Sequence, residues 1–174
     1  YNSAAVIASC LRSIAAQGED LNVETLVVDN ASTDDTTNLI HREFPWANLI
    51  AGDTNIGFAA ANNVGFKAAR GRHFFVLNPD TETLPGTLHR LLRYADTHQR
   101  AGMIAPRVLN TDGSLQHSTF QFPDFHQAFY GFFERLVPID SVANGRYPPE
   151  AYNNERKVDH ILGAAILVQR PLWE

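Results

Sequence analysis

Cysteine is almost absent from the sequence: Cys10 is the only one among 174 residues. A single thiol can form neither an internal disulfide nor a cysteine metal site, so the fold has to depend on its apolar core. Because unpaired thiols are usual in a reducing compartment, the sequence predicts a cytoplasmic protein. With 44% hydrophobic residues, the chain is large enough for one substantial core, and a single domain is the simplest expectation.

Long apolar runs and basic clusters are missing as well. No run approaches the roughly 18 to 20 residues that span a bilayer, and no signal peptide is recognisable, so we expect a protein that is soluble or bound only at the inner face of a membrane. The 14 Lys and Arg residues are outnumbered by 19 Asp and Glu residues and form no stripe, which argues against a nucleic-acid partner. Since the chain opens on Tyr1 and stops at Glu174 without a terminating signal, we expect an excerpt of a longer protein.

The chain does contain, up to about residue 106, a regular alternation of short apolar strands and amphipathic helices. This alternation is typical of an α/β fold with a mostly parallel sheet. Beyond it, the sequence predicts a hairpin turn, an aromatic-rich segment of undetermined structure, a loop and one more strand. The expected helices are 3–17, 33–44, 58–69 and one after Pro85; the expected strands are 24–28, 47–52, 73–77, 103–105 and 158–168; the turn is 110–113, the aromatic segment 120–136 and the loop 142–156.

Polar residues just after the strands are the candidates for a site, because ligands bind α/β sheets beyond the carboxyl ends of the strands. After the strand at 24–28, Asp29 can accept a hydrogen bond from a base imide or a ribose. The alternative is that Asp29 and Ser32 only form a turn and cap the next helix. On position alone, the structural interpretation is favoured.

A second polar loop precedes a helix whose Ala-rich face is interrupted by Asn62, Asn63 and Gly65. Together with Asn55 and Gly57 in the loop, these residues would let a ligand approach the backbone closely. A packing helix with a solvated polar edge would produce the same pattern, and it is again favoured on position alone.

The sharpest feature is Asn78-Pro79-Asp80, in which an apolar strand is followed by a rigid turn that carries a carboxylate. A plain strand-end turn is the alternative. Carboxylate oxygens suit Mg²⁺ or Mn²⁺, and such a cation neutralises the charge that develops on a departing diphosphate. Asp80, diphosphate oxygens and water would be sufficient ligands.

In order and spacing, these motifs resemble family 2 glycosyltransferases over almost the whole chain. The matching segments are 1–3, 27–34, 55–59, 62–65, 77–81 and 163–168. The resemblance implies one partial GT-A domain at 1–174. Its half at 1–106 would be a Rossmann-like sheet flanked by helices that binds a nucleoside-diphosphate sugar, and 107–174 would begin the acceptor-side half. An inverting transfer is implied, with dTDP-rhamnose as donor in the most similar subgroup and a glycan or lipid-linked acceptor.

The resemblance also implies roles for individual residues. Asp80 resembles the metal-binding end of the family's signature, and Asn78 replaces the signature's first aspartate, reaching ribose or water instead of metal. Tyr1 and Asp29 resemble the residues that contact the base. The remaining nucleotide-sugar-binding residues would be Asn30, Asn55, Gly57 and Asn63.

Two parts of the family pattern are missing from the sequence. The family's first strand would precede Tyr1 in the middle of the sheet, and its absence would leave two strands without their shared neighbour. The Glu-Asp pair that supplies the catalytic base would follow Glu174. We assign that role to no carboxylate inside the chain and interpret Asp124, Glu134 and Asp159 as surface or capping residues.

Two further features have both structural and functional interpretations. His160 would line an acceptor cleft or, as we favour, form a hydrogen bond at a strand end. The aromatic cluster would receive a lipid-linked acceptor, lie on a membrane surface or, as we favour, pack in the core. The cluster consists of Phe120, Phe122, Phe125, Phe129, Tyr130, Phe132 and Phe133.

The sequence contains seven histidines, and no two of them are two or four residues apart. Their spacing therefore does not support a histidine metal site.

Two other functions are compatible with the same sheet. A nucleotidyltransferase would need a glycine-rich, basic loop early in the chain, and none is visible. A non-catalytic module that binds a nucleotide sugar would lack the Glu-Asp pair in its complete protein, which is the feature that separates it from a transferase.

Overall fold

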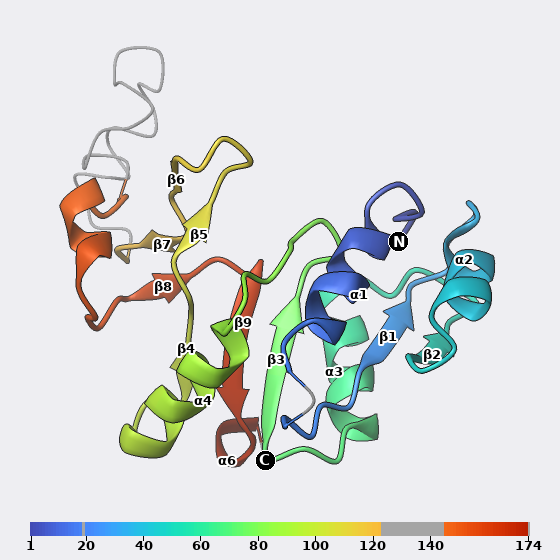
Figure 1. Cartoon of the computed structure of the whole chain (residues 1–174), viewed down its shortest axis with the longest axis horizontal. Coiled ribbons are helices and arrows are strands. Elements are labelled where there is room, and N and C mark those ends of the chain that lie inside the picture. The colour runs from blue at the N-terminus through green and yellow to red at the C-terminus, as the bar shows by residue number, and fades with distance from the viewer. Residues whose placement is uncertain (19, 123–144, 174) are drawn as a thin grey trace. The chain divides into compact units, whose positions relative to one another are not determined.

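The computed structural model of the chain describes residues 1–18, 20–122 and 145–173 (Figure 1). The chain forms two compact units: unit 1 is Tyr1–Ile104 with Ile166–Glu174, and unit 2 is Ala105–Ala165. Each unit is described by itself. Within the described ranges, no helix is long and apolar enough to cross a membrane.

Unit 1 has the alternation of strands and helices that the sequence predicts, which confirms the α/β class. Strand β3 coincides with its predicted range, and most other predicted elements are shorter than predicted. β1 extends one residue beyond its predicted end, and α6 is not predicted. In chain order they are α1 Ile7–Ala15, β1 Leu26–Asp29, α2 Thr36–Glu43, β2 Asn48–Ala51, α3 Phe58–Ala68, β3 His73–Leu77, α4 Thr87–Thr97, β4 Met103–Ile104, β9 Ala165–Gln169 and α6 Arg170–Trp173.

The strands of unit 1 belong to two sheets. β1 pairs in parallel with β2, whereas the second sheet has the order β3-β9-β4, with β9 antiparallel to β4. β1 and β3 are not paired with each other; with residues of α1 and α3 they line a cavity of about 970 Å³. In Figure 1 the arrowheads of β1 and β3 point to the same side of the unit, so both strands end at one edge.

Two apolar clusters hold unit 1 together. In the first, Leu11 of α1 and Ile40 of α2 are buried, Ile40 with only 1% of its surface exposed. In the second, Leu91 of α4, Ile104 of β4 and Leu167 of β9 are buried together. Leu11 and Leu91 come from the apolar faces of their helices, whereas Ile104 and Leu167 are strand residues.

Unit 2 is built from short antiparallel pairs. The predicted hairpin turn is confirmed, because Asn110 N donates to Ser114 O at 2.8 Å and Gly113 adopts a φ of 83°. A 3₁₀ helix lies in the region that the sequence predicts as a loop, with a proline at its start. The elements are β5 Val108–Leu109 with β6 Leu115–Gln116, β7 Thr119–Phe120 with β8 His160–Ile161, and η3 Pro149–Asn153.

The structure corrects the prediction of one strand at 158–168. Leu162 N donates to Ser118 O at 2.8 Å, and the chain turns there, so the segment is divided into β8 and β9. In the aromatic cluster, Phe120 lies in β7 and Phe122 is 67% exposed. The other members of the cluster, at 125–133, lie outside the described residues.

Candidate functional site

The first residues of the chain bind the loop that follows β1. Asn2 N donates to Ser32 Oγ at 2.8 Å, and Thr33 N donates back to Asn2 Oδ1 at 2.8 Å. Ser3 N donates to Thr36 Oγ1 at 2.8 Å. The sequence predicts a helix from residue 3, where Asn2 or Ser3 would be its cap. This start is wrong, because α1 begins only at Ile7 and has no side-chain cap.

Asn2 and Ala31 share an unusual backbone conformation. Within the described ranges, they are the non-glycine residues with positive φ, at 49° and 67°. The left-handed region costs an alanine roughly 1 to 2 kcal/mol, and such strain persists only where the surroundings impose it. Both residues lie in the two segments that contact each other, which makes this contact a candidate functional region.

Asp29 ends β1 and organises the loop after it. Its side chain is buried, with 4% of the residue exposed, and it lines the cavity. Ser32 N donates to Asp29 Oδ2 at 2.9 Å, and Ser32 Oγ donates to Oδ1. Gly52 N, just after β2, donates to Asp29 O at 2.9 Å. The turn of Asp29 and Ser32, the structural alternative in the sequence analysis, is therefore present. The same turn binds the start of the chain, because Ser32 Oγ accepts from Asn2 N.

Two asparagines join the loops after β1 and β2. Asn30 Nδ2 donates to Asn55 Oδ1 at 2.8 Å, and Ile56 N donates to Asn30 Oδ1 at 2.9 Å. Gly57 N donates to Asn55 Oδ1 at 3.0 Å, and its φ of 84° favours glycine. Three predicted site residues, Asn30, Asn55 and Gly57, therefore form one connected structure beyond both strands.

Helix α3 presents a different amide to the cavity from the predicted one. Asn62 lines the cavity and donates to Phe58 O of its own helix at 3.1 Å. Asn63 is exposed and is not among the lining residues. Gly65 allows α3 to approach β1, because a Cβ there would lie 3.3 Å from Val28 Cγ2.

The loop after β3 carries Asn78 and Asp80. Asn78 O accepts from the Cys10 thiol at 3.6 Å and from Thr81 N at 3.1 Å, and Asn78 lines the cavity. Asp80 is exposed, and its Oδ1 lies 3.5 Å from Thr81 Oγ1, so the carboxylate is open to a ligand. Burial, with the nearby carboxylates of Asp80 and Glu82, raises the pKa of Cys10 to about 11. The end of β3 therefore carries a negative potential.

The predicted residues are brought together to different degrees. Tyr1, Asp29, Asn30 and Asn78 line the cavity. Asn55 and Gly57 are attached through Asn30, Asp80 follows Asn78 by two residues, and Asn63 stands apart from the lining. Among residues 1–18, 20–122 and 145–173, no three His, Cys, Asp or Glu side chains form a group that could hold a metal ion. A cation at Asp80 would thus depend on oxygens from a bound molecule.

Some residues that build the site were not predicted from the sequence. Thr36, the first residue of α2, is 2% exposed and accepts the hydrogen bond from Ser3 N. Asp34 Oδ2 accepts from Ala4 N at 3.1 Å, and Asp34 Oδ1 accepts from Thr36 N at 3.1 Å. A carboxylate two residues before a threonine at a helix start is the signal that could have identified them.

We expect acid to weaken the attachment of the first residues to the loop after β1. Hydrogen bonds from the Thr36 hydroxyl, then from Ala4 N and Thr36 N, lower the pKa of Asp34 from 3.8. A carboxyl group with a lowered pKa in the folded state stabilises the fold above its unfolded-state pKa. The contribution is lost as the pH falls below 3.8 and through the folded-state value.

Thermal unfolding of the wild type and of Asp34→Asn from about pH 7 to about pH 3 measures this effect. The wild type should be the more stable protein at neutral pH, and the difference in Tm should shrink in acid. Asp35→Asn is the control, because Asp35 instead accepts from Asn38 at 2.9 Å. A difference in Tm between the wild type and Asp34→Asn that does not change with pH would contradict the prediction.

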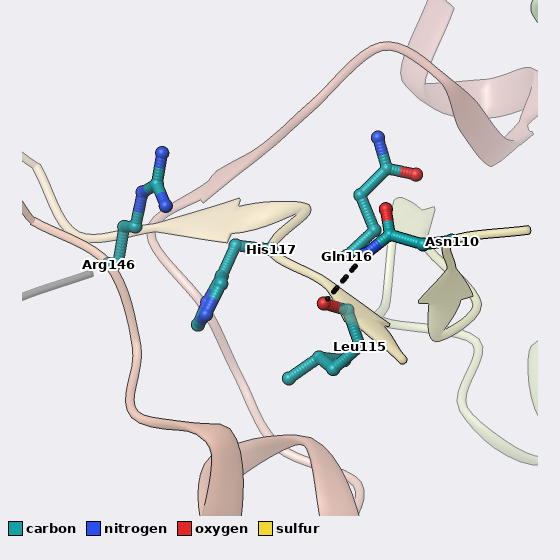
Figure 2. A pocket seen from close by; sticks show the side chains of 5 residues that line it. All are labelled: Asn110, Leu115, Gln116, His117 and Arg146. Carbon is teal, nitrogen blue, oxygen red and sulfur yellow. Dashed lines mark hydrogen bonds between the residues drawn. The ribbon is translucent and has the colours of Figure 1, made fainter. Parts of the chain in front are cut away.

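Unit 2 contains a separate polar pocket of about 430 Å³ (Figure 2). The side chains of Gln116 and Arg146 point to one side in the figure, and that of His117 points to the other. His117 Nδ1 and Ser118 Oγ are buried without a hydrogen-bond partner. Because buried polar atoms are normally paired, this region is a candidate for contact with a ligand. The pocket is lined by Asn110, Leu115, Gln116, His117 and Arg146.

The remaining residues considered from the sequence lie elsewhere in unit 2. Asp159 Oδ2 accepts from Phe122 N at 3.2 Å. His160 is exposed in β8, with its ring centroid 6.2 Å from that of Phe120. Asp124 and Glu134 lie outside the described residues.

Comparison with known proteins gives the context of this site. Residues 1–161 match the family described as Glycosyl transferase family 2. The chain is similar to the succinoglycan biosynthesis protein ExoO of Rhizobium meliloti (strain 1021), with 42% identity over 97 residues, which are 55% of this chain and 28% of that protein. It is also similar to the N-acetylglucosaminyl-diphospho-decaprenol L-rhamnosyltransferase of Mycobacterium tuberculosis (strain ATCC 25618 / H37Rv), with 29% identity over 164 residues, 85% of this chain and 52% of that protein.

Solved structures agree with these similarities. S. aureus TarS has 28% identity and a TM-score of 0.57 over 69% of this chain and 37% of that one, and TarS in complex with UDP has 29% identity and a TM-score of 0.54. The chain spans about half or less of the length of these relatives. The structural neighbours have the GT-A fold, so the predicted fold class is confirmed. Because the family match covers residues 1–161, the chain belongs to glycosyl transferase family 2.

Proposed function

We propose that the chain binds a nucleoside-diphosphate sugar beyond the ends of β1, β2 and β3 and serves the inverting transfer of that sugar to a glycan or lipid-linked acceptor. The observation that carries the proposal is the connected set of loops at these strand ends, in which Asn2 binds Ser32 and Asn30 binds Asn55. Loops in this position are where α/β sheets bind nucleotides. The UDP bound to TarS supports the same class of ligand.

In this proposal, Tyr1 and Asp29 contact the base. Tyr1 is 57% exposed and lines the cavity, so its ring is accessible to a stacked base. Asp29 receives one hydrogen bond from Ser32 on each oxygen, and each oxygen keeps a lone pair for an imide N–H. Asn30, Asn55, Gly57, Asn63 and Asn78 would lie along the rest of the nucleotide sugar.

Asp80 has the properties of a ligand for Mg²⁺ or Mn²⁺. Its carboxylate is exposed, and a second carboxylate, that of Glu82, follows two residues later. The other ligands would be diphosphate oxygens and water. When bound, the ion would neutralise charge on the departing diphosphate. The role of Asp80 is then to hold the diphosphate end of the donor in one orientation.

Within this proposal, the sugar donor is rhamnose carried on dTDP. The motif Asn78-Pro79-Asp80 and the similarity to a protein named as an L-rhamnosyltransferase support it. Unit 2 would face the glycan or lipid-linked acceptor, in contact with the inner surface of the membrane, and its pocket offers amide and guanidinium groups to sugar hydroxyls. The catalytic base would be a carboxylate of the family's Glu-Asp pair, beyond Glu174.

Calorimetric titration of the chain with dTDP and UDP, with and without Mn²⁺, tests this function. We expect Mn²⁺ to raise the affinity for the nucleoside diphosphate about tenfold or more, because unit charges 4 Å apart attract by about 4 kcal/mol at an effective dielectric constant near 20. Asp80→Asn should lose the increase in affinity caused by Mn²⁺, whereas Asp96→Asn, exposed on α4, should keep it.

Tighter binding of dTDP than of UDP would favour the rhamnosyl donor. Equal affinities with and without metal would refute the metal bridge, and no binding of either nucleotide would refute the site.

A further inference from the structure

A buried glutamine just after α1 connects that helix with the loop that follows β3. Gln17 is 3% exposed, and its Nε2 lies 3.0 Å from Thr83 Oγ1 and 3.1 Å from Leu84 O. Its Oε1 accepts from Leu88 N at 3.2 Å. Gln17 therefore binds the end of the loop and the first turn of α4 at the same time.

Thr83 is attached to α1 through both its backbone and its side chain. Thr83 N donates to Ser13 Oγ at 2.9 Å, and Thr83 Oγ1 donates to Ser13 O at 3.0 Å. Thr83 is 8% exposed, so these bonds are shielded from water. A buried polar network whose members are all paired restricts motion more than its separate bonds would suggest.

The other end of the same loop is attached to the same helix. The Cys10 thiol donates to Asn78 O at 3.6 Å. Asp80 lies between Asn78 and Thr83, and its carboxylate has only the long contact to Thr81 Oγ1, at 3.5 Å. The position of Asp80 is therefore determined by two attachments of its loop to α1, and hardly by contacts of its own side chain.

Helix α1 also begins beside the nucleotide end of the proposed site. Ser3 N is bound to Thr36, and α1 follows directly after the turn that Ser3 starts. A helix of nine residues is about 13 Å long. One rigid element thus connects the segment that contacts the loop after β1 with the loop that carries Asp80.

We propose that Thr83, Ser13 and Gln17 are positioning residues: through them, the end of α1 holds Asp80 where it can bind the cation of a metal–diphosphate complex. This inference rests on the proposed function, in which Asp80 is the metal ligand. None of the three residues needs to contact the nucleotide.

Thr83→Val removes the hydroxyl and nearly preserves the shape of the side chain. We expect the increase in dTDP affinity caused by Mn²⁺ to fall about three- to tenfold in this variant, because the hydroxyl that accepts from Gln17 and donates to Ser13 is lost, while the affinity without metal stays at the wild-type value. Thr83→Ser should restore the increase because it returns the hydroxyl. Thr97→Val is the matched control, since its hydroxyl bonds only within and just after α4, at an exposed position.

A purely structural role would lower the Tm and leave the effect of Mn²⁺ on binding unchanged in the folded protein. If Thr83→Val fails to fold, as judged by circular dichroism, Ser13→Ala carries the same test. It removes the acceptor of Thr83 N and places a better helix former inside α1.

The outcomes separate the two proposals. If Mn²⁺ strengthens binding to the wild type and equally to the folded variant, the positioning role is refuted and the proposed function stands. If Mn²⁺ has no effect on the wild type, Asp80 is not a metal ligand, and the metal bridge and the positioning role are both overturned. The proposed nucleotide site is overturned only if neither dTDP nor UDP binds.

Discussion

In a protein that extends past Glu174 through the family's Glu-Asp pair, the proposed catalytic base, Asp80→Ala is expected to lower the turnover of sugar transfer by about 10² or more, the effect of removing one preorganised electrostatic group. The carboxylate is exposed in the loop after β3, where it is open to a ligand. In the part of the chain that the structure describes, no group of three His, Cys, Asp or Glu side chains offers a metal site in place of Asp80. The loss should therefore appear in the chemical step as well as in donor binding.

The stability of the Asp80→Ala protein should remain close to that of the wild type. The side chain makes one long contact, to Thr81 Oγ1 at 3.5 Å, so few native interactions disappear with it. Turnover is measured at saturating donor, metal and acceptor, and Tm is measured on the same preparations. Asp96→Ala is the control for loss of an exposed carboxylate. Turnover of Asp80→Ala within a few-fold of the wild type would exclude a metal-ligand role.

Leu167→Ala is expected to reduce the free energy of unfolding by about 2 to 5 kcal/mol, the range for a buried leucine cut back to alanine. Leu167 is 2% exposed and lies in β9, between β3 and β4. The chain leaves unit 1 after Ile104 and returns to it at Ile166, so β9 fills the middle of its sheet with residues from far along the sequence. Its central leucine packs with Leu91 and Ile104.

Urea unfolding of Leu167→Ala and Leu84→Ala measures this contribution. Leu84 is 62% exposed, so its truncation removes the same atoms with little loss of burial. Equal losses of stability in the two variants would mean that β9 does not contribute to the core of unit 1 in solution.

Elements of unit 1 whose signals are local could be predicted from the sequence. The run at His73–Leu77 is apolar and bounded by polar residues, and β3 occupies that range. Helix α3 begins at Phe58, directly after Gly57, as the break in the pattern indicates. Both predictions depend on residues that are close in the sequence, which is the information that periodicity contains.

Elements whose ends depend on distant partners could not be predicted in this way. Asn2 and Ser3 look like helix caps, but their partners are about 30 residues away, in the loop after β1. Likewise, the segment 158–168 is mostly apolar, and the bond from Leu162 N to Ser118 O lies where its first strand ends. Long-range hydrogen bonds override local preference in both cases.

The residues of the candidate site also fall into two groups, those that the sequence predicts and those that only the structure identifies. Asp29 and Asn55 are predicted from the apolar runs before them: Asp29 is the last residue of β1, and Asn55 lies in the loop after β2. Gln17 and Thr83 have no pattern around them that marks them as buried, and their importance appears only when α1 and the loop after β3 are seen in contact. Residues that hold a site in place carry a weaker sequence signal than residues at strand ends.

The surroundings of Cys10 determine how the protein can be labelled. Thiol reagents react with the thiolate, and a pKa of about 11 leaves only about one thiol in 10⁴ ionised near neutral pH. The residue is also 6% exposed, on the inner side of α1. A cysteine introduced at an exposed position of unit 1, such as Leu84, would therefore react with a maleimide dye far faster than Cys10, and a single fluorophore could report on the loop of Asp80 without removal of the native thiol.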